Sequence, residues 1–199
     1  MKQQEWSKHV ILVDADYVDK VAFDLIVNFE RMLERRIPQA DMARWLECVA
    51  LDGGVRPQPS DIKPQTSIQV VLLHQQQQME NFQPGRFEDL DGKAFQSELG
   101  EFLISCVPVE ELTNMEHLFT DSLQVIANAG EVQRLMVVGN AEQYYNNKVR
   151  EALRHANPDQ HITVFSMQPM TSGNFRQEIL GYSMMAALGI KSAEIAKAP

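Results

Sequence analysis

Five short runs of aliphatic residues recur along the chain, each bounded by polar or turn-forming residues. They occupy residues 9–15, 67–74, 102–107, 134–140 and 161–167. Near-continuous aliphatic runs of this length are typical of strands that are buried on both faces, as in a parallel sheet. We therefore predict five strands in a mostly parallel sheet.

Between these runs, apolar residues return at three- and four-residue spacing, which is the pattern of an amphipathic helix. Helices are expected over about 16–36, 39–51, 114–129, 141–156 and 174–188. Residues 75–100 lack sustained periodicity and predict a long acidic, Gln-rich loop, with a short helix near 94–99. Buried strands that alternate with helices predict an α/β fold, a three-layer sandwich of about five mostly parallel strands with helices on both faces.

No repeat and no linker divides the 199 residues, of which 44% are hydrophobic and 23% charged. This composition and length favour one globular domain. We predict a single α/β domain over residues 1–190 and a frayed, Ala- and Lys-rich tail over 191–199.

The formal net charge of −9 disfavours nucleic-acid binding through a global basic field. The charge is uneven, since residues 67–130 hold 10 acids and 2 bases, whereas residues 131–199 hold 6 acids and 7 bases. A local contact with RNA through the C-terminal third is therefore not excluded. The acidic loop is either a surface for a protein partner or a solvent-exposed loop without a partner. No apolar run approaches the ~20 residues of a membrane helix, so we expect no membrane contact and a cytoplasmic location.

Candidate site residues follow from the fold, because ligands of such sheets bind outside the carboxyl ends of the strands. Carboxylates there supply the hard oxygen ligands that Mg²⁺ or Mn²⁺ prefers. The candidate metal ligands are Asp14, Asp16 and Glu142 at the strand ends, together with Asp121 from the helix before the fourth strand. The alternative is that these acids only cap helices and complement their dipoles.

Three other polar residues at the same strand ends, Asn140, His74 and Ser166, are candidate binding residues. No catalytic residue is assigned. The chain has no Gly-rich dinucleotide motif, no P-loop and no Gly-x-Ser-x-Gly elbow, and its two cysteines have no zinc-binding spacing. A Rossmann-like enzyme acting on a small phosphorylated ligand has no positive support.

Two stretches carry a resemblance to a known superfamily. In one, the first aliphatic run ends in Asp14 and leads into a helix; in the other, Asp121 precedes a helix and the run that ends in Asn140-Ala141-Glu142. This order resembles the PIN and NYN superfamily of metal-dependent, Rossmannoid nucleases, and in particular small bacterial families of that fold with no known activity. The acid before the helix matches Asp121, with Glu116 as the alternative.

The motifs depart from the superfamily at two places. NYN domains carry Asn three residues after the first Asp, where this chain has Tyr17, and their fourth strand ends in Ser-Gly-Asp-Ser-Asp-Phe, where this chain has Asn140 and Glu142. Loss of a ligand charge weakens a divalent metal site. The resemblance therefore implies a degenerate domain that acts as a binding or interaction module, as a homodimer or with another protein, without robust nuclease activity. The alternative is a Mg²⁺- or Mn²⁺-dependent ribonuclease that uses the four acids.

Overall fold

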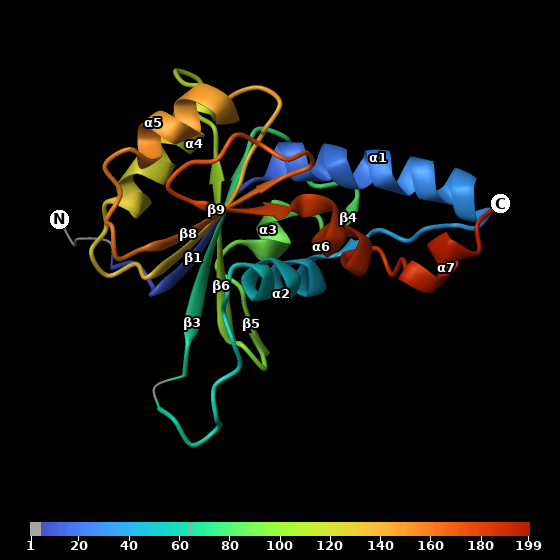
Figure 1. Ribbon diagram of the computed structural model, residues 1–199, viewed down its shortest axis with the longest axis horizontal. Coiled ribbons are helices and arrows are strands. Elements are labelled where there is room, and N and C mark those ends of the chain that lie inside the picture. Colours follow the sequence, from blue (N-terminus) through green and yellow to red (C-terminus); the bar gives the residue numbers. More distant parts are fainter. Residues whose placement is uncertain (1–4, 64) are drawn as a thin grey trace.

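The computed structural model describes residues 5–63 and 65–199 (Figure 1). Its strands are β1 (His9–Asp14), β2 (Ala40–Asp41), β3 (Ser67–His74), β4 (Phe82–Gln83), β5 (Ala94–Ser97), β6 (Gly100–Pro108), β7 (Arg134–Val138), β8 (His161–Ser166) and β9 (Arg176–Ile179). Its helices are α1 (Ala15–Leu33), α2 (Met42–Asp52), α3 (Phe87–Leu90), α4 (Met115–Ala127), the π-helical turn η1 (Tyr145–Val149), α5 (Arg150–Leu153), α6 (Leu180–Ala187) and α7 (Ser192–Ala196).

The central sheet has the strand order β5-β6-β3-β1-β7-β8-β9. All neighbours pair in parallel except β5, which runs antiparallel to β6. The predicted α/β fold with a mostly parallel sheet is confirmed, although the sheet has seven strands where about five were expected. The two additional strands, β5 and β9, are four residues long and form the two edges.

Both edge strands replace predicted helical segments. Residues 94–97 form β5 instead of a short helix, and residues 176–179 form β9 before the last helix begins at Leu180. An edge strand pairs on one side only and tolerates polar side chains. The Arg-Gln-Glu-Ile sequence of β9 therefore lacks the aliphatic character by which buried strands are recognised.

Alternate residues of the sheet pack on opposite faces, as the two-residue period of a strand requires. On one face Ile11, Val13 and Val70 join α1, α2, α3 and α6, and on the other Val10 and Leu12 join α4 and α5. Figure 1 shows these two groups of helices on either side of the sheet. The sandwich therefore has the three predicted layers.

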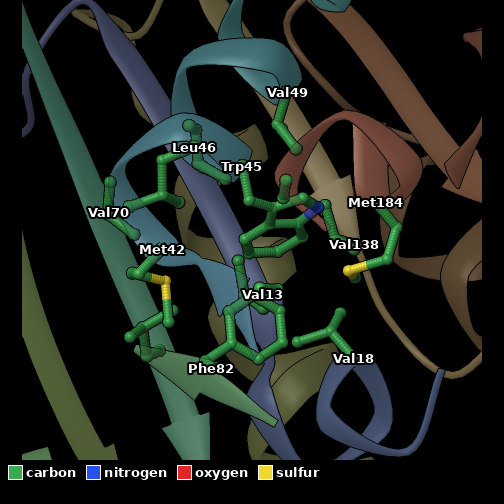
Figure 2. Close-up of a cluster of buried hydrophobic side chains, with 14 of the residues drawn as sticks. Val13, Val18, Met42, Trp45, Leu46, Val49, Val70, Phe82, Val138 and Met184 are labelled. Atoms are coloured by element: carbon green, nitrogen blue, oxygen red, sulfur yellow. The ribbon is translucent and has the colours of Figure 1, made fainter. Parts of the chain in front are cut away.

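The larger core lies under α2. Trp45 is fully buried there, and its ring meets Phe82 edge-on with the ring centroids 5.5 Å apart. Figure 2 shows Met42, Leu46 and other aliphatic side chains around this pair. The short strands β2 and β4 pair with each other and carry Phe82 into this core, so the 75–100 stretch contributes to the core and is not only a loop.

Two further segments differ from the sequence prediction. Residues 141–144 form turns, and Tyr144 has φ −134° and ψ 2°, which interrupts the helix expected over 141–156. The tail expected to be frayed carries α7, and Glu194 of this helix accepts a hydrogen bond from Arg35 Nε at 2.8 Å. Among the described residues, no helix combines the length and apolar character needed to cross a membrane.

Candidate functional site at the carboxyl edge of the sheet

The chain changes direction in the sheet between β1 and β7. From β1 it continues to β3 on one side, and β7 lies against β1 on the other side, with all three strands parallel. A crevice opens outside the carboxyl ends of the strands at such a switch point. Asp14 ends β1 at this place and Asn140 follows β7.

Asp14 lies at the centre of this edge and is 3% exposed. As the N-cap of α1 it accepts a hydrogen bond from the Tyr17 amide through Oδ1 at 3.0 Å. Its Oδ2 accepts a hydrogen bond from the Tyr144 hydroxyl at 2.6 Å. Burial raises the pKa of this carboxyl, and the two hydrogen bonds oppose that rise. Both oxygens of Asp14 therefore have protein partners.

Asp16 and Asp19 hold the segment that follows β3. The Asp16 carboxylate accepts hydrogen bonds from the backbone amides of Gln75 and Gln76 at 3.0–3.2 Å. Asp19 is buried and accepts hydrogen bonds from the amides of Glu80, at 3.3 Å, and Asn81, at 2.9 Å. The acids at the start of α1 are thus a helix cap and two anchors for the 75–81 segment.

The other two predicted metal ligands lie elsewhere. Asp121 lines a separate hollow of about 310 Å³ between α4 and the sheet, with Trp6 and Val125. Glu142 is exposed and lies 3.9 Å from Lys20 Nζ. Within the part of the chain that the structure describes, no three His, Cys, Asp or Glu side chains are grouped to hold a metal ion. The four acids therefore do not fit the Mg²⁺ or Mn²⁺ that the resemblance implies.

Two hollows flank the first turn of α1. We call the first the switch-point hollow, and it measures about 390 Å³. It is lined by Asp14, Asp16, Tyr17, Lys20, Gln75, Gln76, Met115, Glu116, Asn140, Gln143 and Tyr144. We call the second the β8 hollow, and it measures about 360 Å³. It is lined by Tyr17, Ala141, Glu142, Ser166, Met167, Gln168, Pro169, Met170 and Thr171. Tyr17 lines both. Volumes of this size match small-molecule sites.

Tyr17 is 4% exposed, and its buried hydroxyl has no hydrogen-bond partner among the described residues. A buried polar group without a partner costs about 1–3 kcal/mol. Burial, together with the negative charges of Glu142, Asp14 and Asp24, raises the pKa of Tyr17 to about 12. The hydroxyl is therefore neutral at physiological pH and keeps its capacity to donate and to accept.

The wall of the β8 hollow after Ser166 is held by several hydrogen bonds. Ser166 Oγ donates to the Gln168 carbonyl at 2.6 Å, and the Met170 amide donates to Gln177 Oε1 at 3.0 Å. The Arg150 guanidinium donates to the backbone carbonyls of residues 171 and 172. The positive charge of Arg150 is thus bound to the back of the loop and does not line the hollow.

The three predicted binding residues separate in the structure. Asn140 lines the switch-point hollow, where its Oδ1 also accepts a hydrogen bond from the Gln143 amide at 3.2 Å. Ser166 lines the β8 hollow. His74 lines neither; it stacks on Phe87 with the ring centroids 3.7 Å apart, and its Nδ1 lies 2.9 Å from the Gln76 carbonyl.

Sequence reasoning did not identify two side chains of this edge, Tyr17 and Tyr144, as site residues. Tyr17 was noted only as the residue in place of a family Asn, and Tyr144 lies within the helix predicted over 141–156. Glu116, considered as the alternative to Asp121, lines the switch-point hollow, whereas Asp121 does not. The spacing of Asp14 and Tyr17 could have indicated the position of Tyr17, because the residue three positions after an N-cap lies in the first turn of the helix, beside the capping side chain.

Comparison with curated proteins and with solved structures finds no match. A family model described as a family of unknown function, DUF6621, matches residues 3–195, which is nearly the whole chain. The chain belongs to this family of unknown function.

Proposed function

We propose that the protein is a degenerate PIN/NYN-like domain that acts as a binding module, without robust nuclease activity, and takes its ligand at the carboxyl edge of β1, β7 and β8. The observation that carries this proposal is that the carboxylates at this edge already accept hydrogen bonds from the protein. Both Asp14 oxygens accept hydrogen bonds from the protein, and Asp16 accepts two backbone amides.

A catalytic magnesium or manganese ion needs carboxylate oxygens that converge on one point beside the substrate. Here, by contrast, the acids at the start of α1 stabilise the fold, Asp121 belongs to another hollow and Glu142 is at the surface. What the edge retains is space, in two hollows separated by Tyr17. This arrangement supports binding better than it supports the alternative, a metal-dependent ribonuclease.

The test is RNA cleavage with added Mn²⁺, together with thermal unfolding with and without Mn²⁺. We expect no cleavage above the protein-free control and no shift of the melting temperature by Mn²⁺. The comparison variants are Asp14→Asn and Asp121→Asn, each checked by circular dichroism. Cleavage by the wild type that is lost in a folded Asp14→Asn variant would establish the ribonuclease instead.

An interaction role is supported by apolar side chains that the fold leaves exposed. On α1, Phe23 is 53% and Val27 37% exposed, and on α6 Tyr182 is 71% exposed. Exposed apolar side chains of this size favour contact with another protein surface. We propose a cytoplasmic homodimer, and light scattering of the wild type against Phe23→Ser tests it. A wild type that is monomeric at all concentrations would contradict the dimer.

A further inference from the structure

We propose that the β8 hollow binds a small organic cation, an alkylammonium group with an apolar body, and that Tyr17, Glu142 and Ser166 receive its charged end. The inference rests on the proposed binding function and names the ligand class of one of its two hollows. The hydroxyl of Tyr17, which has no partner among the described residues, belongs to a side chain that lines both hollows, and of these two the β8 hollow has a single charged lining residue, the acidic Glu142.

The first step is the unpartnered hydroxyl of Tyr17. This side chain is 96% buried, its oxygen has no partner among the described residues, and the residue lines both hollows. Its oxygen is closed to solvent, so binding requires the wall of the hollow to move. A ligand N–H that donates to this oxygen completes a hydrogen bond that the protein leaves unmade.

The second step is the sign of the charge. Glu142 is the one charged side chain of the β8 hollow as the structure describes it, and it is acidic. The charges that act on the Tyr17 hydroxyl from Glu142, Asp14 and Asp24 are all negative. Two bases lie near this wall without lining the hollow: Lys20, which is exposed and 3.9 Å from both Glu142 and Asp24, and Arg150, which donates to the carbonyl of Thr171. A carboxylate or phosphate ligand would be repelled, whereas an ammonium group would be attracted.

The third step is the shape of the remaining wall. Ser166 Oγ uses its proton on the Gln168 carbonyl, so towards a ligand it is an acceptor. Met167, Pro169 and Met170 supply apolar surface next to it. An ammonium group can donate up to three hydrogen bonds, to the oxygens of Tyr17, Glu142 and Ser166. Its alkyl chain can pack against the flexible methionine side chains.

The experiment compares three probes that differ only in the end group: hexylammonium, 1-hexanol and hexanoate. Binding is measured by titration calorimetry and by ¹H–¹⁵N shifts of the amides of Tyr17, Ala141 and Ser166. We expect hexylammonium to bind and shift these amides, hexanol to bind more weakly and hexanoate not to bind. Equal or better binding of hexanoate, or no binding by any probe, would overturn the inference.

Variants locate the binding. Glu142→Gln should weaken hexylammonium binding by about threefold, as expected for the loss of one exposed charge pair. Tyr17→Phe should leave the melting temperature of the free protein unchanged or raise it slightly, and should weaken hexylammonium binding. Asp121→Asn, in the hollow under α4, is the matched control and should bind as the wild type does. Unaltered binding by both Glu142→Gln and Tyr17→Phe would also overturn the inference.

The outcomes separate this inference from the proposed function. If hexanol or hexanoate shifts the same amides and hexylammonium does not, the edge binds ligands but the cation class is wrong. If Mn²⁺ raises the melting temperature and RNA is cleaved, the binding-module function itself fails.

Discussion

The first turns of α1 and the segment after β7 leave the sheet at the same edge, and both carry acids, yet they use them differently. In α1, Asp14, Asp16 and Asp19 accept backbone amides of their own helix or of the 75–81 segment. After β7, Glu142 is exposed, and Lys20, 3.9 Å away, is its ion-pair partner among the described residues. The acids near the start of α1 therefore stabilise the fold, because backbone amides lie within hydrogen-bond distance of them. Glu142 accepts no such amide among the described residues and is exposed to a ligand.

The largest test of this comparison is Asp14→Ala. The change removes an N-cap, worth about 1 kcal/mol, and the acceptor of the Tyr144 hydroxyl, so we expect a loss of about 3 kcal/mol in the free energy of unfolding. Urea unfolding measures it. Asp24→Ala, an exposed acid of the same helix, is the control and should cost less than about 0.5 kcal/mol. Equal losses in the two variants would remove the special role of Asp14.

The next test is Asp19→Ala. It leaves the amides of Glu80 and Asn81 without their carboxylate acceptor, and we expect a loss of about 2 kcal/mol. Hydrogen exchange of these two amides should accelerate more than that of amides in β7. Unchanged exchange at Glu80 and Asn81 would mean that the 75–81 segment is held by other contacts.

A smaller effect separates the two tyrosines beside Asp14. Tyr144→Phe loses the hydroxyl that donates to Asp14, so its expected cost is about 1.5 kcal/mol. Tyr17→Phe loses a hydroxyl that has no partner among the described residues, so we expect no loss of stability or a small gain. Thermal and urea unfolding of both variants check this. A similar loss in both would show that the Tyr17 hydroxyl is bonded in solution.

The smallest effect is a pH dependence. Burial raises the pKa of Asp14 in the folded protein above the ordinary value of 3.8. As the pH rises from about 4, the unfolded chain therefore releases this proton first, and the stability that Asp14 contributes falls until the pH passes its folded pKa. The pKa values of Asp19 and Asp52 are also raised by burial. The difference in unfolding free energy between the wild type and Asp14→Asn isolates Asp14 and should favour the wild type most at low pH. A difference that grows with pH would contradict the direction of the shift.

The hydrophobic pattern predicted the buried strands well because their signal is local. Residues 67–74 were predicted as a strand and form β3 with the same bounds. The edge strands β5 and β9 carry polar residues, and their pairing partners lie elsewhere in the sheet, so no local pattern marks them. In the interrupted segment after β7, the Tyr144 hydroxyl donates to Asp14, 130 residues away, and no local pattern indicates such a contact.

For the site, two of the candidate residues, Asp14 and Asn140, lie together as predicted, whereas the four acids are not grouped around one metal position among the described residues. That Asp14 and Asn140 would lie at the same edge followed from the parallel sheet, and the structure places both at the switch-point hollow. Which acids would find backbone amides, and that Tyr17 would lie between two hollows, depends on the path of the 75–81 and 167–171 segments. No local pattern in the sequence indicates those paths.

The two tryptophans of the chain lie on opposite faces of the sheet. Trp45 is fully buried under α2, whereas Trp6 is half-buried beside α4 and lines the hollow that contains Asp121. Their fluorescence therefore reports on different layers, with blue-shifted emission from Trp45 and a more solvent-like spectrum from Trp6. Single-tryptophan variants would show whether the two layers of this sandwich melt together or one after the other.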